Sequence, residues 1–188
     1  KADPSQSRLE RVNLPTPAAA IALGDFIPDH GNGTQIAALS ADGSTLSILS
    51  RNASNAWQTA RSVRLPLRVD LTNPTNVLAA GRFTNDPGEQ LLVVDSTGKQ
   101  VSMFSASGTQ GIEQVLTVSA ENTPLTAIPT RTGTAARAGL AILQRGVVVS
   151  FINAPTNAMT VATQADVLDS TDRRRLGVKA AATVVGNN

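Results

Sequence analysis

The chain has no cysteine and no tyrosine, and its aromatic residues are limited to one tryptophan and four phenylalanines. Without cysteine it cannot be a disulfide-stapled scaffold, and 188 residues can bury a core that folds without such bridges. No apolar run approaches the roughly 18 residues that a membrane-spanning helix needs. These absences favour a single globular domain, for which about 100 to 200 residues are typical.

Charged residues are also sparse. The 16 Lys and Arg residues nearly balance the 14 Asp and Glu residues, and the net charge is +2. We therefore expect no basic face and no nucleic-acid partner. The one dense charge run, at residues 172–175, has no aromatic platform beside it, and we interpret it as a solvated loop.

The sequence is instead rich in short apolar runs. Runs of four to six residues, mainly Val, Ile and Leu, alternate with segments of Gly, Asn, Asp, Pro and Ser, which is typical of an all-β protein. The motif Gly24-Asp25-Phe26 returns as Gly81-Arg82-Phe83. Pairs of apolar runs joined by a tight turn occur three times, at residues 36–39 and 46–49, 91–94 and 101–104, and 140–143 and 148–151.

Each repeat predicts a four-stranded antiparallel sheet. Its first strand ends at the Gly-x-Phe position, the two apolar runs form a hairpin, and the last strand begins near Trp57, Ile112 or Met159. Units of four strands and roughly 40 to 50 residues are typical of β-propeller blades. The alternative is a β-sandwich of unrelated short strands. We expect the aromatic residues to be buried where successive sheets stack, and they are Phe26, Trp57, Phe83, Phe104 and Phe151.

The unit boundaries predict three complete blades at residues 18–73, 74–123 and 124–176, with partial blades at 1–17 and 177–188. Residues 9–15 resemble the last strand of a blade, and residues 181–188 resemble the first strand. Open ends of this kind expose unpaired strand edges. We therefore expect a segment of a larger propeller, or one part of an assembly whose other blades come from another polypeptide. The alternative is a four-bladed ring with a thin last blade.

The repeats resemble the FG-GAP or VCBS-type repeats of integrin alpha-like propellers and of many bacterial secreted proteins. The likeness is carried by Gly24-Asp25-Phe26 with the loop to Asp29, and by Gly81-Arg82-Phe83 with the loop at 85–88. Its spacing covers nearly the whole chain, although the motif itself is short. The resemblance implies an extracellular or periplasmic protein, with any signal segment outside this sequence, and a calcium-binding loop with acids at alternate positions.

Calcium takes six to eight oxygen ligands, and the chain offers few of them. The first loop keeps Asp25 and Asp29, with Asn32 as a third oxygen donor, which leaves at best one weak Ca²⁺ site. In the second loop Arg82 stands at the first ligand position, and the third loop contains no acid. The alternative is that Asp25 and Asp29 only bind backbone amides in the turn.

The sequence offers few candidate catalytic residues. The one histidine, His30, lies in a Gly-rich loop, and no nucleophile elbow, phosphate loop or zinc spacing is present. A glycosidase pair would require Asp95, Glu113 and Glu121 to converge across the fold. We therefore expect a non-catalytic extracellular module for binding, scaffolding or adhesion, whose loops meet a protein or glycan surface. The alternative is a fragment of a secreted polysaccharide-active or other enzyme with its catalytic residues outside this chain.

Overall fold

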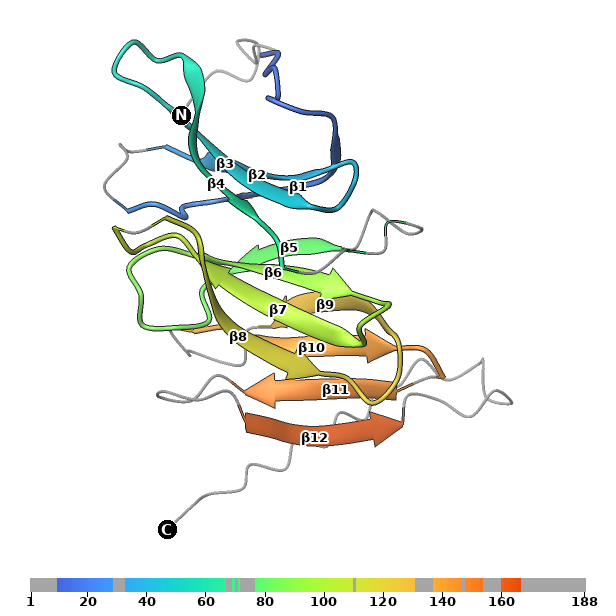
Figure 1. Cartoon of the computed structure of the whole chain (residues 1–188). Helices are drawn as coiled ribbons and strands as arrows, with labels where there is room; N and C mark the ends of the chain where they lie inside the picture. The colour runs from blue at the N-terminus through green and yellow to red at the C-terminus, as the bar shows by residue number, and fades with distance from the viewer. Residues whose placement is uncertain are drawn as a thin grey trace, which may run out of the picture.

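The structure is a computed structural model that describes residues 10–28, 33–66, 69, 71, 77–109, 111–130, 137–146, 148–153 and 160–166. Every regular element in these ranges is a β-strand. The strands form three four-stranded antiparallel sheets, each built from four strands that follow one another in the chain. Figure 1 shows the three sheets one above another. The predicted all-β fold of repeated antiparallel sheets is therefore confirmed, and three stacked sheets are not the two layers of a sandwich.

Each sheet has its strands in the order of the chain. The first sheet contains β1 (Ala18–Gly24), β2 (Gln35–Ser40), β3 (Thr45–Arg51) and β4 (Trp57–Arg64). The second contains β5 (Leu78–Gly81), β6 (Gln90–Asp95), β7 (Gln100–Ser105) and β8 (Glu113–Ser119). The third contains β9 (Pro124–Thr130), β10 (Gly139–Gln144), β11 (Val148–Asn153) and β12 (Thr160–Asp166). These strands fall within the expected units 18–73, 74–123 and 124–176.

A short polar turn makes the hairpin of the first sheet. The Asp42 carboxylate accepts hydrogen bonds from the hydroxyls of Ser40 and Ser44 and, at 3.1 Å, from the amide of Ser44. Gly43 follows with a φ of 69°, in the left-handed region that glycine enters without steric cost. The chain therefore reverses here between β2 and β3.

Two apolar cores lie between the three sheets, one between each pair of neighbours. Side chains alternate between the two faces of a strand, so Leu91 and Val93 of β6 enter the first core while Leu92 and Val94 enter the second. The first sheet supplies Ala37, Leu39, Leu46 and Ile48 to the first core. The third sheet supplies Ala127, Leu140 and Ile142 to the second core. The central strands β6 and β7 of the second sheet are therefore buried on both faces, which explains why β6 is apolar without alternation.

Three of the aromatic rings are buried between sheets as predicted. Phe26 and Phe104 lie in the first core and Phe83 in the second. The side chain of Phe151 lies outside the described residues. Trp57 departs from the prediction, because it is half-buried at the start of β4 with the Arg51 guanidinium 4.6 Å from its ring centroid.

The N-terminal segment also departs from the prediction. The resemblance of residues 9–15 to the last strand of a blade predicts a strand, but residues 10–16 form none. This segment is held by the side chain of Glu10, which accepts from the indole N–H of Trp57 at 3.0 Å and pairs with Arg51. A strand needs a neighbour to share its ladder, and none is provided among the described residues. The predicted partial blade at 177–188 lies outside them.

Candidate functional site

A buried glutamine closes each of the two Gly-x-Phe loops. Gln35, the first residue of β2, accepts at Oε1 from the amides of Phe26 (3.0 Å) and Ile27 (2.9 Å). Its Nε2 donates to the carbonyl oxygen of Ile27 at 2.9 Å. The side chain is 1% exposed, so its three hydrogen bonds lie out of water and fix the loop that follows β1.

The second loop repeats this arrangement. Gln90, the first residue of β6, accepts from the amides of Phe83 (2.7 Å) and Thr84 (3.0 Å) and donates to the carbonyl oxygen of Gly88 at 2.6 Å. The third sheet has Gly139 at the matching register position and no Gly-x-Phe motif. The sequence analysis did not identify these glutamines. In the sequence, each can be recognised as a Gln directly before the first apolar run of a unit that carries the Gly-x-Phe motif.

The glycine of the motif leaves room for the phenylalanine ring of the same loop. A Cβ at Gly24 would lie 2.7 Å from the ring of Phe26, and one at Gly81 would lie 2.9 Å from the ring of Phe83. Both distances are too short for a carbon–carbon contact. The motif therefore requires glycine so that the ring can fold back over the strand end and enter the core between sheets.

The residue between glycine and phenylalanine joins neighbouring sheets. The carbonyl oxygen of Asp25 accepts from the amide of Glu89 at 2.7 Å, and that of Arg82 accepts from the amide of Ala138 at 2.7 Å. Glu89 and Ala138 each directly precede the second strand of the next sheet. We call these two contacts the junction bonds. At the first junction the carboxylate of Glu89 also accepts from the amide of Asp25 at 3.2 Å.

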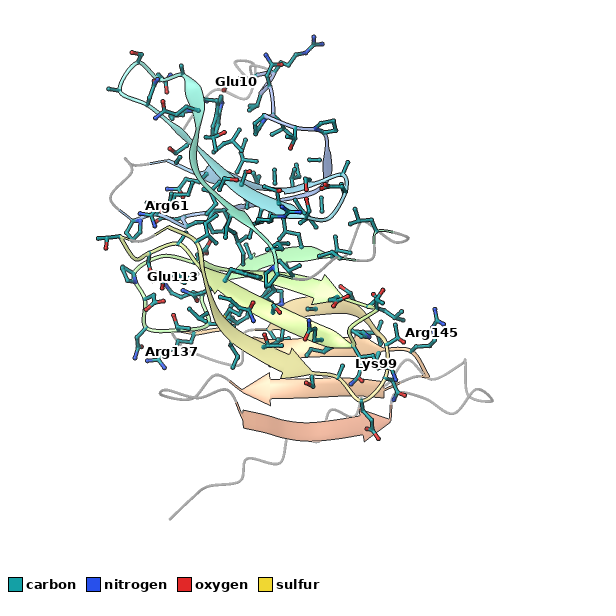
Figure 2. All side chains as sticks on the ribbon, in the orientation of Figure 1. Glu10, Arg61, Lys99, Glu113, Arg137 and Arg145 are labelled. Carbon is teal, nitrogen blue, oxygen red and sulfur yellow. The ribbon has the colours of Figure 1, made fainter. Side chains whose placement is uncertain are left out.

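Arg61 connects the outer parts of the first two sheets. It lies on β4, and its Nη1 donates to three backbone carbonyl oxygens of the loop between β7 and β8, those of Ala106, Gly108 and Gly111. Figure 2 shows Arg61 on the side of the first sheet that faces the second. The matching position in the second sheet is Leu116, which packs against the second core. This contact is therefore specific to the first junction.

In the described part of the first loop, two oxygens already accept hydrogen bonds. Oε1 of Gln35 and the carbonyl oxygen of Ile27, which could turn towards a cation, already accept N–H donors. Of the three predicted ligands, Asp25 is exposed, whereas Asp29 and Asn32 lie outside the described residues. In the portion of the chain that the structure covers, no three His, Cys, Asp or Glu side chains gather as a metal site would require.

The second loop holds a positive side chain where the family pattern would place an acid. Nη2 of Arg82 donates to the carbonyl oxygen of Pro87 at 2.6 Å. The nearby carboxylate of Asp86 accepts from the hydroxyl of Ser105 at 3.1 Å. Protein donors therefore satisfy the oxygens of this loop.

Of the three acids predicted for a glycosidase pair, Glu113 does not converge with Asp95. Asp95 is buried at the end of β6 and accepts from the amides of Thr97 and Gly98. Glu113 pairs with Ser105 at the other end of β7, five residues from the Asp95 turn, which corresponds to about 17 Å along a strand. Figure 2 shows Glu113 and Lys99 at opposite ends of the second sheet. Catalytic carboxylates lie roughly 5 to 9.5 Å apart.

The remaining sequence candidates for catalysis are Glu121 and His30. Glu121 follows β8, at the end of the second sheet that carries Asp95, and is exposed. His30 lies outside the described residues. Within the described ranges, no helix could cross a membrane.

Large apolar side chains are exposed on the first strands of the two terminal sheets. Ile21 and Leu23 on β1 are 58% and 61% exposed, and Ile128 on β9 is 51% exposed. By contrast, Leu78 on β5 of the second sheet is only 8% exposed. These three are the most exposed large apolar side chains among the described residues.

No protein-family model matches the chain, and no curated protein matches it. The likeness of the Gly-x-Phe motif to FG-GAP or VCBS-type repeats therefore stays a prediction from sequence, and the function has to be argued from the geometry.

Proposed function

We propose that this chain is a segment of a β-propeller of the FG-GAP or VCBS type, which acts outside the cytoplasm as a non-catalytic binding and scaffolding module. The observation that carries the proposal is the pair of junction bonds, Asp25 with Glu89 and Arg82 with Ala138. The same backbone atoms of the repeat join the first sheet to the second and the second to the third. Such regular stacking is what a propeller requires.

The spacing of the sheets also supports a propeller. The main backbone approaches between neighbouring sheets all involve a first strand, because β5 contacts both β1 and β9, and β9 also contacts β6 and β7. Among the described residues, the fourth strands β4 and β8 do not approach each other comparably. Sheets that converge at their first strands and diverge at their fourth strands form a fan, as blades around a central axis do.

The role in binding follows from this rigidity. Buried glutamines hold the Gly-x-Phe loops, and two cores hold the sheets, so the loops form a preorganised surface. Loops on a rigid scaffold commonly carry recognition. We expect the partner to be a protein or glycan surface, and the proposal requires no calcium ion in the described loops.

Native-state hydrogen exchange tests the stacking. The amides of Glu89 and Ala138 lie outside strands, so only the junction bonds protect them. We expect protection close to that of β6 amides, whereas the amide of the exposed loop residue Asn85 should exchange freely. Exchange of Glu89 and Ala138 as fast as Asn85 would overturn the propeller arrangement.

A turnover assay tests the non-catalytic role. The chain is incubated with a panel of plant, algal and bacterial polysaccharides, and released reducing ends are measured beside retardation in affinity gels. We expect no release from any polymer. Release by the purified chain that is abolished in an acid-to-amide variant would overturn the proposal and favour the secreted-enzyme alternative.

A further inference from the structure

The second sheet shows what normally covers the front of a first strand. Leu78 and Ala80 on β5 pack into the core shared with the first sheet. By strand register, Leu78 opposite Val93 matches Ile21 opposite Ala38, and Ala80 opposite Leu91 matches Leu23 opposite Ile36. In the second sheet, these positions are covered by the preceding sheet. In the first sheet, the same positions are occupied by Ile21 and Leu23. We call them the front patch.

The third sheet carries the complementary exposed position. Ala127 on β9 points into the second core, so its neighbour Ile128 points away from the second sheet. Ile128 lies opposite Ala141, as Ala22 lies opposite Ala37 and Ala79 opposite Leu92. Ala22 and Ala79 pack against the core shared with the following sheet. We call Ile128 the back patch.

We propose that two copies of this chain associate head to tail, with the back patch of one copy packed against the front patch of the other. The inference rests on the proposed function, because it continues the sheet-to-sheet contact that the chain uses twice within itself. A second copy supplies a back face that no sheet among its described residues covers. The contact also removes Ile21, Leu23 and Ile128 from water, at positions that bury apolar side chains in the second sheet.

The backbone supports the same pairing. Thr34 directly precedes β2, as Glu89 precedes β6 and Ala138 precedes β10. The amides of Glu89 and Ala138 donate across a junction to the preceding sheet. The amide of Thr34, an exposed residue, stands where it can donate to a sheet placed before the first one. Two copies bring six sheets, within the roughly four to eight blades of closed propellers.

Sedimentation velocity of the parent chain and three variants tests the inference. Leu23→Asp alters the front patch and Ile128→Asp the back patch, and both positions are exposed, so the fold should survive, as far-UV circular dichroism can verify. Val115→Asp is the matched control, because Val115 is 45% exposed on β8 of the second sheet and belongs to neither patch. We expect twice the chain mass of 19.4 kDa for the parent and for Val115→Asp. Each patch variant should sediment as a monomer.

Mixing the two patch variants distinguishes a head-to-tail contact from other modes of association between copies. In an equimolar mixture, Leu23→Asp keeps an intact back patch and Ile128→Asp keeps an intact front patch, so one contact can form between them. We expect the mixture to regain the dimer mass. A parent that stays monomeric, a patch variant that still dimerises, or a mixture that stays monomeric would overturn the inference.

The two proposals can fail separately. A monomeric parent with protected Glu89 and Ala138 amides and no polysaccharide turnover overturns only the head-to-tail contact, and its front patch would then face a different polypeptide. Turnover of a polysaccharide by a dimeric parent overturns only the non-catalytic role.

Discussion

At the scale of the residue, the two buried glutamines are the side chains on which the repeat depends most. Gln35 and Gln90 are themselves buried, and each satisfies two backbone amides and one backbone carbonyl of a Gly-x-Phe loop. Sequence reasoning could find the Gly-x-Phe motif, because glycine and phenylalanine stand out in a chain with five aromatic rings. It did not find the glutamines, because a polar residue before an apolar run looks like an ordinary strand end.

The first prediction concerns Gln90→Leu. Leucine has a similar size but leaves the amides of Phe83 and Thr84 and the carbonyl oxygen of Gly88 without their partner. Buried groups that lose a hydrogen bond cost about 1 to 3 kcal/mol each. Three such groups are involved, so we expect the free energy of unfolding in urea to fall by about 3 kcal/mol or more. The exposed Gln58 on β4 offers the control, since Gln58→Leu should change it by less than about 0.5 kcal/mol.

The second prediction concerns pH and the turn at Asp42. Hydrogen bonds from Ser40 and then Ser44 lower the pKa of Asp42 from 3.8 to about 2. Because the folded state favours the ionised carboxyl, its contribution to stability is complete above pH 3.8 and is lost as the pH falls towards 2. We expect Asp42→Asn to be less stable than the parent at neutral pH. Urea titrations over this range should show the difference shrinking with acidification, and a constant difference would contradict the assignment.

At the scale of the element, the strands followed from local pattern, whereas the contacts between sheets did not. Apolar runs bounded by Gly, Asp and Ser predicted the hairpins, and β4 begins at Trp57 as expected. Residues 9–15 were misread because a strand-like sequence cannot reveal whether a neighbouring strand exists. Glu89, an acid in a loop, turned out to accept from the amide of Asp25 in another sheet, which no local pattern indicates.

The third prediction tests a contact between elements. Arg61→Leu removes the guanidinium that donates to the carbonyl oxygens of Ala106, Gly108 and Gly111. Hydrogen bonds from a charged group contribute about 1.5 to 3 kcal/mol, and we expect a loss of that order in the free energy of unfolding. Arg64→Leu, at an exposed position on the same strand, is the matched control. Equal effects of the two substitutions would show that Arg61 does not connect the sheets.

At the scale of the whole molecule, the repeats made the architecture predictable from the amino-acid sequence. The Gly-x-Phe motif and the paired apolar runs predicted antiparallel sheets of four strands, and the three sheets follow one another in the chain as expected. The candidate calcium site was harder to predict from the sequence, because the sequence does not show which loop oxygens already accept hydrogen bonds. The exposed apolar residues of β1 needed coordinates as well, since only exposure distinguishes Ile21 from its buried counterpart Leu78.

The junction bonds have an evolutionary consequence. Each is made by main-chain atoms, and the accepting residue is an acid in one unit and a base in the next. A contact of this kind survives mutational drift at that side chain. Tandem duplication of one unit would therefore create a new sheet that can form the same backbone contact with its neighbour, so the number of units could change without a new contact of this kind.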